Sequence, residues 1–136
     1  MKKLYQHIIN EFKSVTNKFD DSITVQRYEE NLTNQVGIIL SGSRADEECI
    51  SGEVEWEAME LEIQITCENN ANEIFENIDI VREFVDKFEN EPSTVDGLEI
   101  IWAKHLGAKC RPAYTNGYGL EVIKCVIDIN YRLEED

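Results

Sequence analysis

Only a few side chains in this 136-residue chain have the chemistry that catalysis or metal binding requires. The two histidines, His7 and His105, titrate near neutral pH, but neither has a Cys, Asp or His at the spacing of a metal site. The chain has no phosphate-binding glycine loop, no serine nucleophile elbow and no zinc-binding histidine pair. We therefore predict no enzyme, no cofactor and no metal site, with a histidine site assembled by the fold as the alternative.

The cysteines do not indicate a redox or zinc site either. Cys49, Cys67, Cys110 and Cys125 are far apart in the sequence, so there is no CxxC pair. No apolar segment approaches the ~18 residues that a membrane span needs, and polar residues interrupt the start of the chain too early for a signal peptide. We expect reduced, mostly buried thiols and no membrane partner.

Acidic residues dominate the middle of the chain. The whole sequence has 28 acidic and 13 basic residues, a net charge of −15. Residues 41–100 hold eighteen of the acids and three of the bases, and 3 − 18 = −15 accounts for the whole imbalance. This charge argues against nucleic acid and anionic membranes as partners, because both are held by Lys and Arg. The stretch is either a solvated face that keeps the protein soluble, or a surface that repels DNA or meets a basic partner.

Two segments have the apolar periodicity of amphipathic helices. The first covers residues 3–16, and Phe19 extends its apolar stripe. The second begins after Asn70, which precedes Glu73 by three residues in the pattern of a capping box, and it ends near Glu89 because Pro92 follows. Its predicted buried stripe is Ala71, Ile74, Phe75, Ile78, Val81, Phe84, Val85 and Phe88.

Five further segments have the alternation or the β-branched composition of strands. They cover residues 23–28, 35–41, 53–66, 98–105 and 120–133. A tight hairpin turn is predicted at Asn116-Gly117, because this pair accepts positive φ angles. The predicted order is α-β-β-β-α-β-β in a single domain, residues 1–136. Because hairpins dominate this order, we expect an α+β fold with a mainly antiparallel sheet and two helices packed on one face.

The strand at residues 53–66 changes phase. One apolar set, Val54, Trp56 and Ala58, is followed by a set of opposite parity, Met59, Leu61, Ile63 and Ile65. A two-residue repeat changes phase only where a residue is inserted, so we predict a bulge at Ala58-Met59 and an arm formed by the first half. Apolar residues on such an arm need another surface, so the candidate subunit interface is Val54, Trp56 and Ala58. The candidate acidic surface is Glu53, Glu55, Glu57, Glu60 and Glu62.

Several features together resemble a known family. An N-terminal helix precedes short strands, a strand leads directly into the second helix, and a polar turn precedes a long last strand. The residues that carry these features are Asn69-Asn70, His105, Pro112, Asn116-Gly117-Tyr118-Gly119 and Asp128-Ile129-Asn130-Tyr131. In this order the chain resembles the small tail-terminator and head–tail joining proteins of long-tailed phages and prophages, often labelled minor capsid proteins.

The resemblance implies a structural component of the virion, made in the bacterial cytoplasm, that forms a ring, usually a hexamer. Such a ring ends the tail tube and joins it to the head, so its partners are copies of itself, the tail tube and head-connector proteins. DNA passes through the ring, and acidic or neutral walls suit a channel that must not grip it. The alternative that the charge leaves open is an acidic binding module, a DNA mimic or inhibitor that occupies a basic site on a partner protein.

Overall fold

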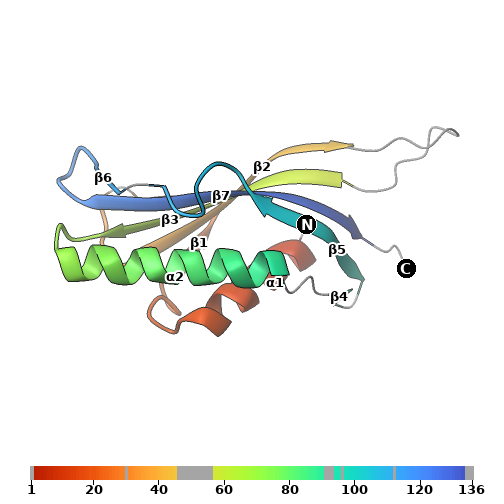
Figure 1. Cartoon of the computed structure of the whole chain (residues 1–136), viewed down its shortest axis with the longest axis horizontal. Coiled ribbons are helices and arrows are strands. Elements are labelled where there is room, and N and C mark those ends of the chain that lie inside the picture. The colour runs from red at the N-terminus through yellow and green to blue at the C-terminus, as the bar shows by residue number, and fades with distance from the viewer. Residues whose placement is uncertain are drawn as a thin grey trace, which may run out of the picture.

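The computed structural model describes residues 2–29, 31–45, 57–90, 94–95, 97–111 and 113–133. It is an α+β domain of two helices and a curled sheet of seven strands (Figure 1). In chain order the elements are α1 (Lys2–Val15), β1 (Ile23–Val25), β2 (Gln35–Ala45), β3 (Glu57–Cys67), α2 (Ala71–Asn90), β4 (Thr94–Val95), β5 (Leu98–His105), β6 (Tyr114–Thr115) and β7 (Glu121–Leu133).

The sheet is mixed rather than purely antiparallel. Its strands lie in the order β1-β2-β3-β7-β5-β4, and β6 pairs with the start of β7. β1 and β2 pair in parallel, whereas the other described pairs are antiparallel. The α+β class and the two helices are as predicted, but the parallel edge and the two-residue strands β4 and β6 are not. Strands this short carry no sequence pattern, because alternation is recognisable only over several residues.

Both helices lie on the same side of the sheet (Figure 1). The apolar stripe of α1 is buried, with Leu4, Ile8 and Phe12 fully removed from solvent. The ring of Phe12 lies 5.5 Å from the ring of Phe84 in α2, centroid to centroid, and Phe19 joins the same cluster. These aromatic contacts hold α1 against α2, so the helical layer is packed through its own side chains as well as against the sheet.

The N-terminus of α2 is capped as predicted, although by half of a capping box. Asn70 Oδ1 accepts hydrogen bonds from the backbone N–H groups of Asn72 at 2.9 Å and Glu73 at 3.4 Å. The Glu73 carboxylate turns away from the cap and binds Lys18 Nζ at 2.9 Å. Asn70 therefore satisfies two of the unpaired N–H groups of the helix, while Glu73 ties the helix to the segment after α1.

The buried face of α2 differs from the predicted stripe in its first turns. The buried residues are Asn77, Val81, Phe84, Val85 and Phe88. Asn77 lies one turn before Val81 on the same face, so an amide occupies an inward position. Phe75 lies off this face and is 65% exposed, and its predicted place in the core is therefore wrong.

β7 is the central strand of the core. Its inward residues are fully buried and alternate as predicted, namely Ile123, Cys125, Ile127, Ile129 and Tyr131. β3 pairs with β7 in one continuous register from Glu57 to Cys67, so the bulge predicted at Ala58-Met59 is not in β3. The register shift lies in β2, where Gly42 and Ser43 stand opposite Met59 alone. The long pairing with β7 holds β3 straight, and the neighbouring strand takes the extra residue at a glycine.

The turn between β6 and β7 lies at the predicted place with a different geometry. The positive φ angle is at Gly119, at +77°, and not at Asn116 or Gly117. Asn116 Oδ1 accepts hydrogen bonds from the backbone N–H groups of Tyr118 at 2.9 Å and Leu120 at 3.2 Å. The asparagine therefore stabilises the turn through its side chain rather than through a left-handed backbone.

Candidate functional site

The predicted subunit interface is only partly described. Val54 and Trp56 lie outside the described residues. Ala58 lies in β3 between Arg44 of β2 and Asn130 of β7, and its side chain is already buried within the chain. Among these three residues, only Val54 and Trp56 therefore stay candidates for an exposed anchor.

The arm on which they would lie is mostly outside the described residues. β2 and β3 run on past the end of α2, and Ala45 and Glu57 form the last described pair between them (Figure 1). At this end β3 also pairs with β7, at Glu57 with Tyr131 and at Ala58 with Asn130. The described ends of β2 and β3 therefore belong to the sheet, and the arm stays a prediction.

The predicted acidic surface is represented by two side chains. Glu53 and Glu55 lie outside the described residues, and Glu57 is described by its strand pairing alone. Glu60 is exposed and Glu62 is half-buried, and both have the opposite parity in β3 to the buried residues of the helix-facing core.

Glu62 is partly neutralised on this outer face of the sheet. Its Oε1 lies 3.4 Å from Lys124 Nζ, and its Oε2 accepts a hydrogen bond from Gln64 Nε2 at 2.8 Å. Glu60 stands opposite Asp128 in the β3–β7 register, so two like charges share a strand pair. Asp128 stands opposite Lys104 of β5 on its other side, so the described part of this outer face is mixed in charge.

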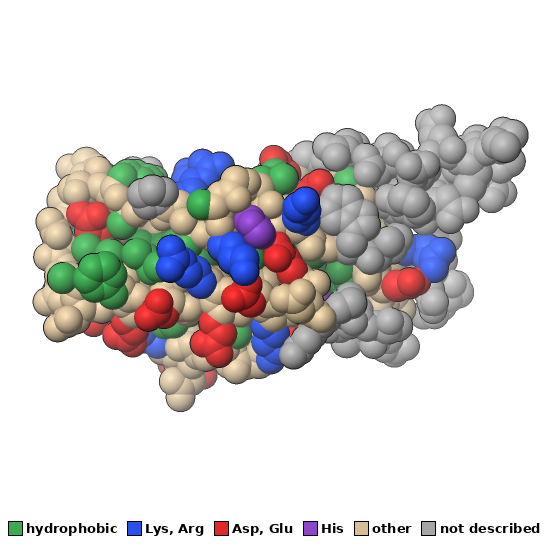
Figure 2. Space-filling model, viewed as in Figure 1, with side chains coloured by type: hydrophobic (Ala, Val, Ile, Leu, Met, Phe, Trp, Pro, Cys, Tyr) green, Lys and Arg blue, Asp and Glu red, His purple; other side chains and the backbone are tan. Residues whose placement is uncertain are grey.

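The charge on the helical side is mixed. Figure 2 shows acidic and basic side chains interspersed over α2, with hydrophobic side chains gathered at the end where α2 begins. Part of this mixture is paired, because Lys109 Nζ bonds to Asp86 in α2 and Lys87 Nζ lies 4.0 Å from Glu11 Oε2 in α1. The face in this view is thus not uniformly acidic, although residues 41–100 carry the net charge.

Asn130 is a buried polar residue that the sequence pattern did not identify. Its side chain is fully buried on the same sheet face as Ala58, and neither its Oδ1 nor its Nδ2 has a hydrogen-bond partner among the described residues. An unsatisfied buried amide costs about 1–3 kcal/mol for each such group. The only sequence signal was an asparagine in the middle of a long strand, where this residue type is depleted.

His105 forms the one histidine–carboxylate pair found among the described residues. Its Nδ1 lies 2.6 Å from Glu89 Oε1, and the backbone N–H of His105 donates to the same oxygen. The pair joins the end of β5 to the last turns of α2. His7 is instead buried in α1 with its ring 5.8 Å from that of Phe88, and burial lowers the pKa of His7.

The described thiols are not activated for chemistry. Cys67, Cys110 and Cys125 are free and buried, as predicted, while Cys49 lies outside the described residues. Burial raises the pKa of all three thiols, and that of Cys125 to about 12. At neutral pH they are therefore protonated, and a protonated thiol is a poor nucleophile and metal ligand.

The described residues include neither a candidate metal centre nor a membrane-spanning helix. They contain no group of three or more His, Cys, Asp or Glu side chains that could hold a metal ion. Neither α1 nor α2 is long and apolar enough to cross a membrane.

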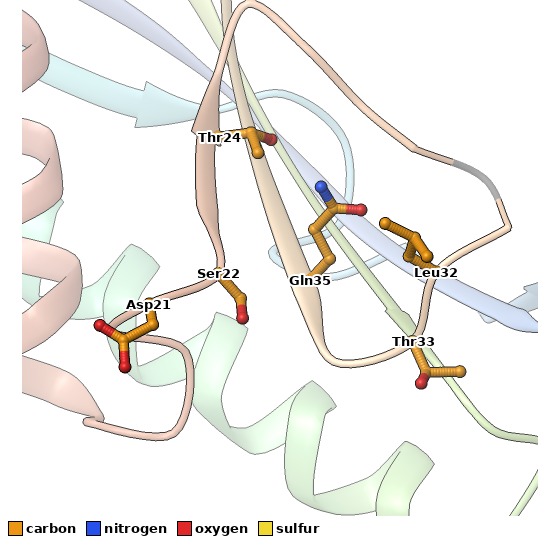
Figure 3. A pocket seen from close by; sticks show the side chains of 6 residues that line it. All are labelled: Asp21, Ser22, Thr24, Leu32, Thr33 and Gln35. Carbon is orange, nitrogen blue, oxygen red and sulfur yellow. The ribbon is translucent and has the colours of Figure 1, made fainter.

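A pocket of about 280 Å³ lies beside β1 (Figure 3). The residues that line it come from the segment before β1, from β1 itself and from the start of β2: Asp21, Ser22, Thr24, Leu32, Thr33 and Gln35. Gln35 is only 6% exposed, and its Oε1 has no hydrogen-bond partner. None of these residues belongs to a sequence motif, because the fold brings them together from both sides of the link at residues 26–34.

No protein-family model matches the chain, and no curated protein matches it.

Proposed function

We propose that the chain is a structural, non-enzymatic component of the virion of a long-tailed phage or prophage. It forms a ring that ends the tail tube and joins it to the head. The proposal rests on the resemblance in the order of elements and turns, and it is supported by the α+β architecture with two helices on one side of the sheet. A fold alone does not establish a function, so the proposal depends on the surface through which the subunits would join.

The observation that carries the proposal is the end of the sheet at which β2 and β3 extend past α2. These strands pair with each other beyond the end of α2 as far as Ala45 and Glu57 (Figure 1). Val54 and Trp56 lie in the sequence between these two strand ends, and apolar side chains on an arm that projects from them would need another surface. In a ring, that surface belongs to the next subunit, which joins head to tail and closes by rotation.

Charge is consistent with this role. Glu53, Glu55 and Glu57 would keep the free arm soluble and disfavour edge-to-edge aggregation before assembly. On the sheet face away from the helices, Glu60 and Asp128 add negative charge beside Lys104 and Lys124. A channel wall with an excess of acidic residues would let DNA pass with little of the salt-dependent attraction that unpaired Lys and Arg add.

The net charge of −15 also favours a second function, an acidic module that occupies a basic site on a partner protein. The two functions differ in self-association. The ring requires contacts between copies of the chain, probed at Trp56, whereas a DNA mimic works as a single copy or a small oligomer with its acidic face free.

Sedimentation of the wild type and of Trp56→Ala tests the ring. We expect a species near six times the 15.7 kDa chain mass for the wild type, alone or on purified tail tubes. Removing a central aromatic anchor typically costs about 2 kcal/mol or more, which weakens each contact more than tenfold. Trp56→Ala should therefore shift the protein toward monomer with an unchanged melting temperature.

The matched control is Tyr118→Ala, which removes another aromatic side chain, one that is exposed on the turn before β7. It should leave the ring intact. A wild type that stays monomeric both alone and with tail tubes would contradict the ring. A ring that Trp56→Ala leaves intact would show that the arm is not the joint.

A further inference from the structure

The pocket beside β1 contains a polar group that the protein does not satisfy. Figure 3 shows the Gln35 amide between Thr24 and Leu32, with its oxygen directed toward Leu32. Gln35 is 94% buried, since 6% of it is exposed, and its Oε1 lacks a hydrogen-bond partner. A buried carbonyl oxygen without a donor is unfavourable, so its presence beside a pocket needs an explanation.

A second glutamine in the same region shows that the fold can satisfy such a side chain. Gln26 Nε2 donates to the backbone oxygen of Leu40 at 2.8 Å, and the N–H of Leu40 donates to Gln26 Oε1 at 2.6 Å. Gln26 therefore continues the sheet ladder where β1 ends. Gln35 has no comparable role in the fold, which leaves its amide available to a ligand.

The unpaired buried group at the pocket is an acceptor, the Gln35 oxygen. The hydroxyl of Thr24 directs its one hydrogen to the backbone oxygens of Arg27 at 2.6 Å and Val36 at 3.3 Å, so its lone pairs are left to accept. The hydroxyls of Ser22 and Thr33 and the NH2 group of Gln35 can also donate to a ligand. Asp21 is the charged residue among those that line the pocket, although in Figure 3 its carboxylate is directed away from Gln35. The described lining residues include no Lys, Arg or His, so an anionic ligand would find no counter-charge there.

We propose that this pocket binds a cationic nitrogen group that donates N–H hydrogen bonds, such as a guanidinium or an ammonium. Gln35 Oε1 and Thr24 Oγ1 accept its N–H groups, and Asp21 balances its charge. Leu32, which is half-exposed, moves off the Gln35 oxygen as the ligand enters. The proposal is independent of the ring, because it rests on this pocket alone.

The volume of the pocket limits the ligand. At about 280 Å³ it lies just below the range of ~300–1,000 Å³ that is usual for small-molecule sites. It therefore suits the end of a side chain or a small amine rather than a nucleotide or a cofactor. A guanidinium provides the most N–H donors in one plane, so an arginine analogue is the best probe.

The test is an NMR titration of the full chain with N-acetyl-L-arginine amide. We expect saturable shifts of the Gln35 side-chain amide and of the backbone signals of Thr24 and Leu32. The neutral analogue N-acetyl-L-citrulline amide should bind at least about tenfold more weakly, because it keeps three of the five N–H donors and lacks the charge. Equal binding of both analogues, or no saturable shift at this pocket with the arginine analogue, would overturn the proposal.

Two variants and a control separate binding from folding. Gln35→Met keeps the shape of the side chain without its polar atoms, so it should weaken arginine binding at least about tenfold while the melting temperature stays equal or rises. Gln6→Met, the same change on the exposed face of α1, should leave binding unchanged. Asp21→Asn, at an exposed position, should weaken the arginine analogue and not the citrulline analogue.

A lower melting temperature for Gln35→Met would show that the Gln35 side chain stabilises the folded state. It would overturn the role of Gln35 as a site residue. Unchanged arginine binding in both Gln35→Met and Asp21→Asn would overturn the proposed contacts directly.

Discussion

At the residue scale, the described part of the domain has three buried side-chain amides, and they differ in how far they are satisfied. Asn77 Oδ1 accepts a hydrogen bond from Lys18 Nζ at 3.2 Å, so it has a structural role between α2 and the segment after α1. Each of the three keeps at least one unpartnered polar atom among the described residues, namely Nδ2 of Asn77, Oε1 of Gln35 and both polar atoms of Asn130. None of the three was predictable from sequence, because amides are usually found on the surface and nothing local marks an inward one.

Val81 tests the assignment of the buried face of α2. It is fully removed from solvent in the middle of that face, so Val81→Asp would place an unpaired carboxylate in the core. The cost is several kcal/mol, comparable to the total stability of about 5–15 kcal/mol that is typical of a domain. We expect the variant to be unfolded or strongly destabilised in thermal denaturation.

The control is Phe75→Asp on the same helix, at a position that is largely exposed. It should change the stability by no more than about 0.5 kcal/mol. The opposite ranking of the two variants would show that the helix is rotated relative to the sheet.

His7 makes the stability depend on pH. Burial lowers the pKa of His7 below the ordinary value of 6.5, while the nearby Glu11 charge acts in the opposite direction. Below about pH 6.5 the unfolded chain takes up a proton that the folded chain does not, so the free energy of unfolding falls as the pH decreases through this window. Urea denaturation at several pH values should show this loss, and His7→Gln should have a flatter profile. Parallel profiles for the two proteins would show that His7 titrates normally in the folded state.

At the element scale, the long elements were predictable and their irregularities were not. β5 has the predicted bounds, Leu98–His105, and α2 ends within a residue of its predicted end. The strand predicted at residues 23–28 is shorter, because Gln26 adopts a positive φ of 56° and the extended backbone ends at Val25. The bulge was predicted in the wrong strand, because the apolar residues of β3 change face without an inserted residue: Ala58 is buried on one face and Met59 on the other.

The cap of α2 gives a prediction at this scale. Asn70 Oδ1 accepts two backbone N–H groups that would otherwise be unpaired, so Asn70→Ala should lower the stability by about 1 kcal/mol. Asn72→Ala is the control, since Asn72 is exposed in the first turn and binds the cap through its backbone only. Chemical denaturation should show a lower midpoint for Asn70→Ala alone, and equal midpoints would contradict the capping role.

At the scale of the whole molecule, the sheet topology was not predictable from the sequence, whereas the net charge leads to a prediction about DNA binding. The order β1-β2-β3-β7-β5-β4 places the last strand in the centre, and no local pattern reveals such a topology. The alternation of β7 did indicate the residues that face the helical side of the core, but it did not indicate that Val122, Val126 and Asn130 are buried on the other face. The pocket beside β1 was not predictable, because it depends on how the segment before β1 meets the start of β2.

The net charge predicts the behaviour toward DNA. With 28 acidic and 13 basic residues, the isolated protein should bind double-stranded DNA no better than an inert acidic protein. A gel-shift assay at physiological salt checks this. Submicromolar binding would contradict the idea that the protein lines a DNA channel without gripping it.

The most direct measurement is the location of the protein in phage particles. Particles released by the bacterial strain that carries the gene would be purified and labelled with gold-coupled antibodies against the chain. The account predicts label at a single place, the junction between the head and the tail. Particles that lack the protein, or that carry it along the tail or over the head, would contradict the proposed function.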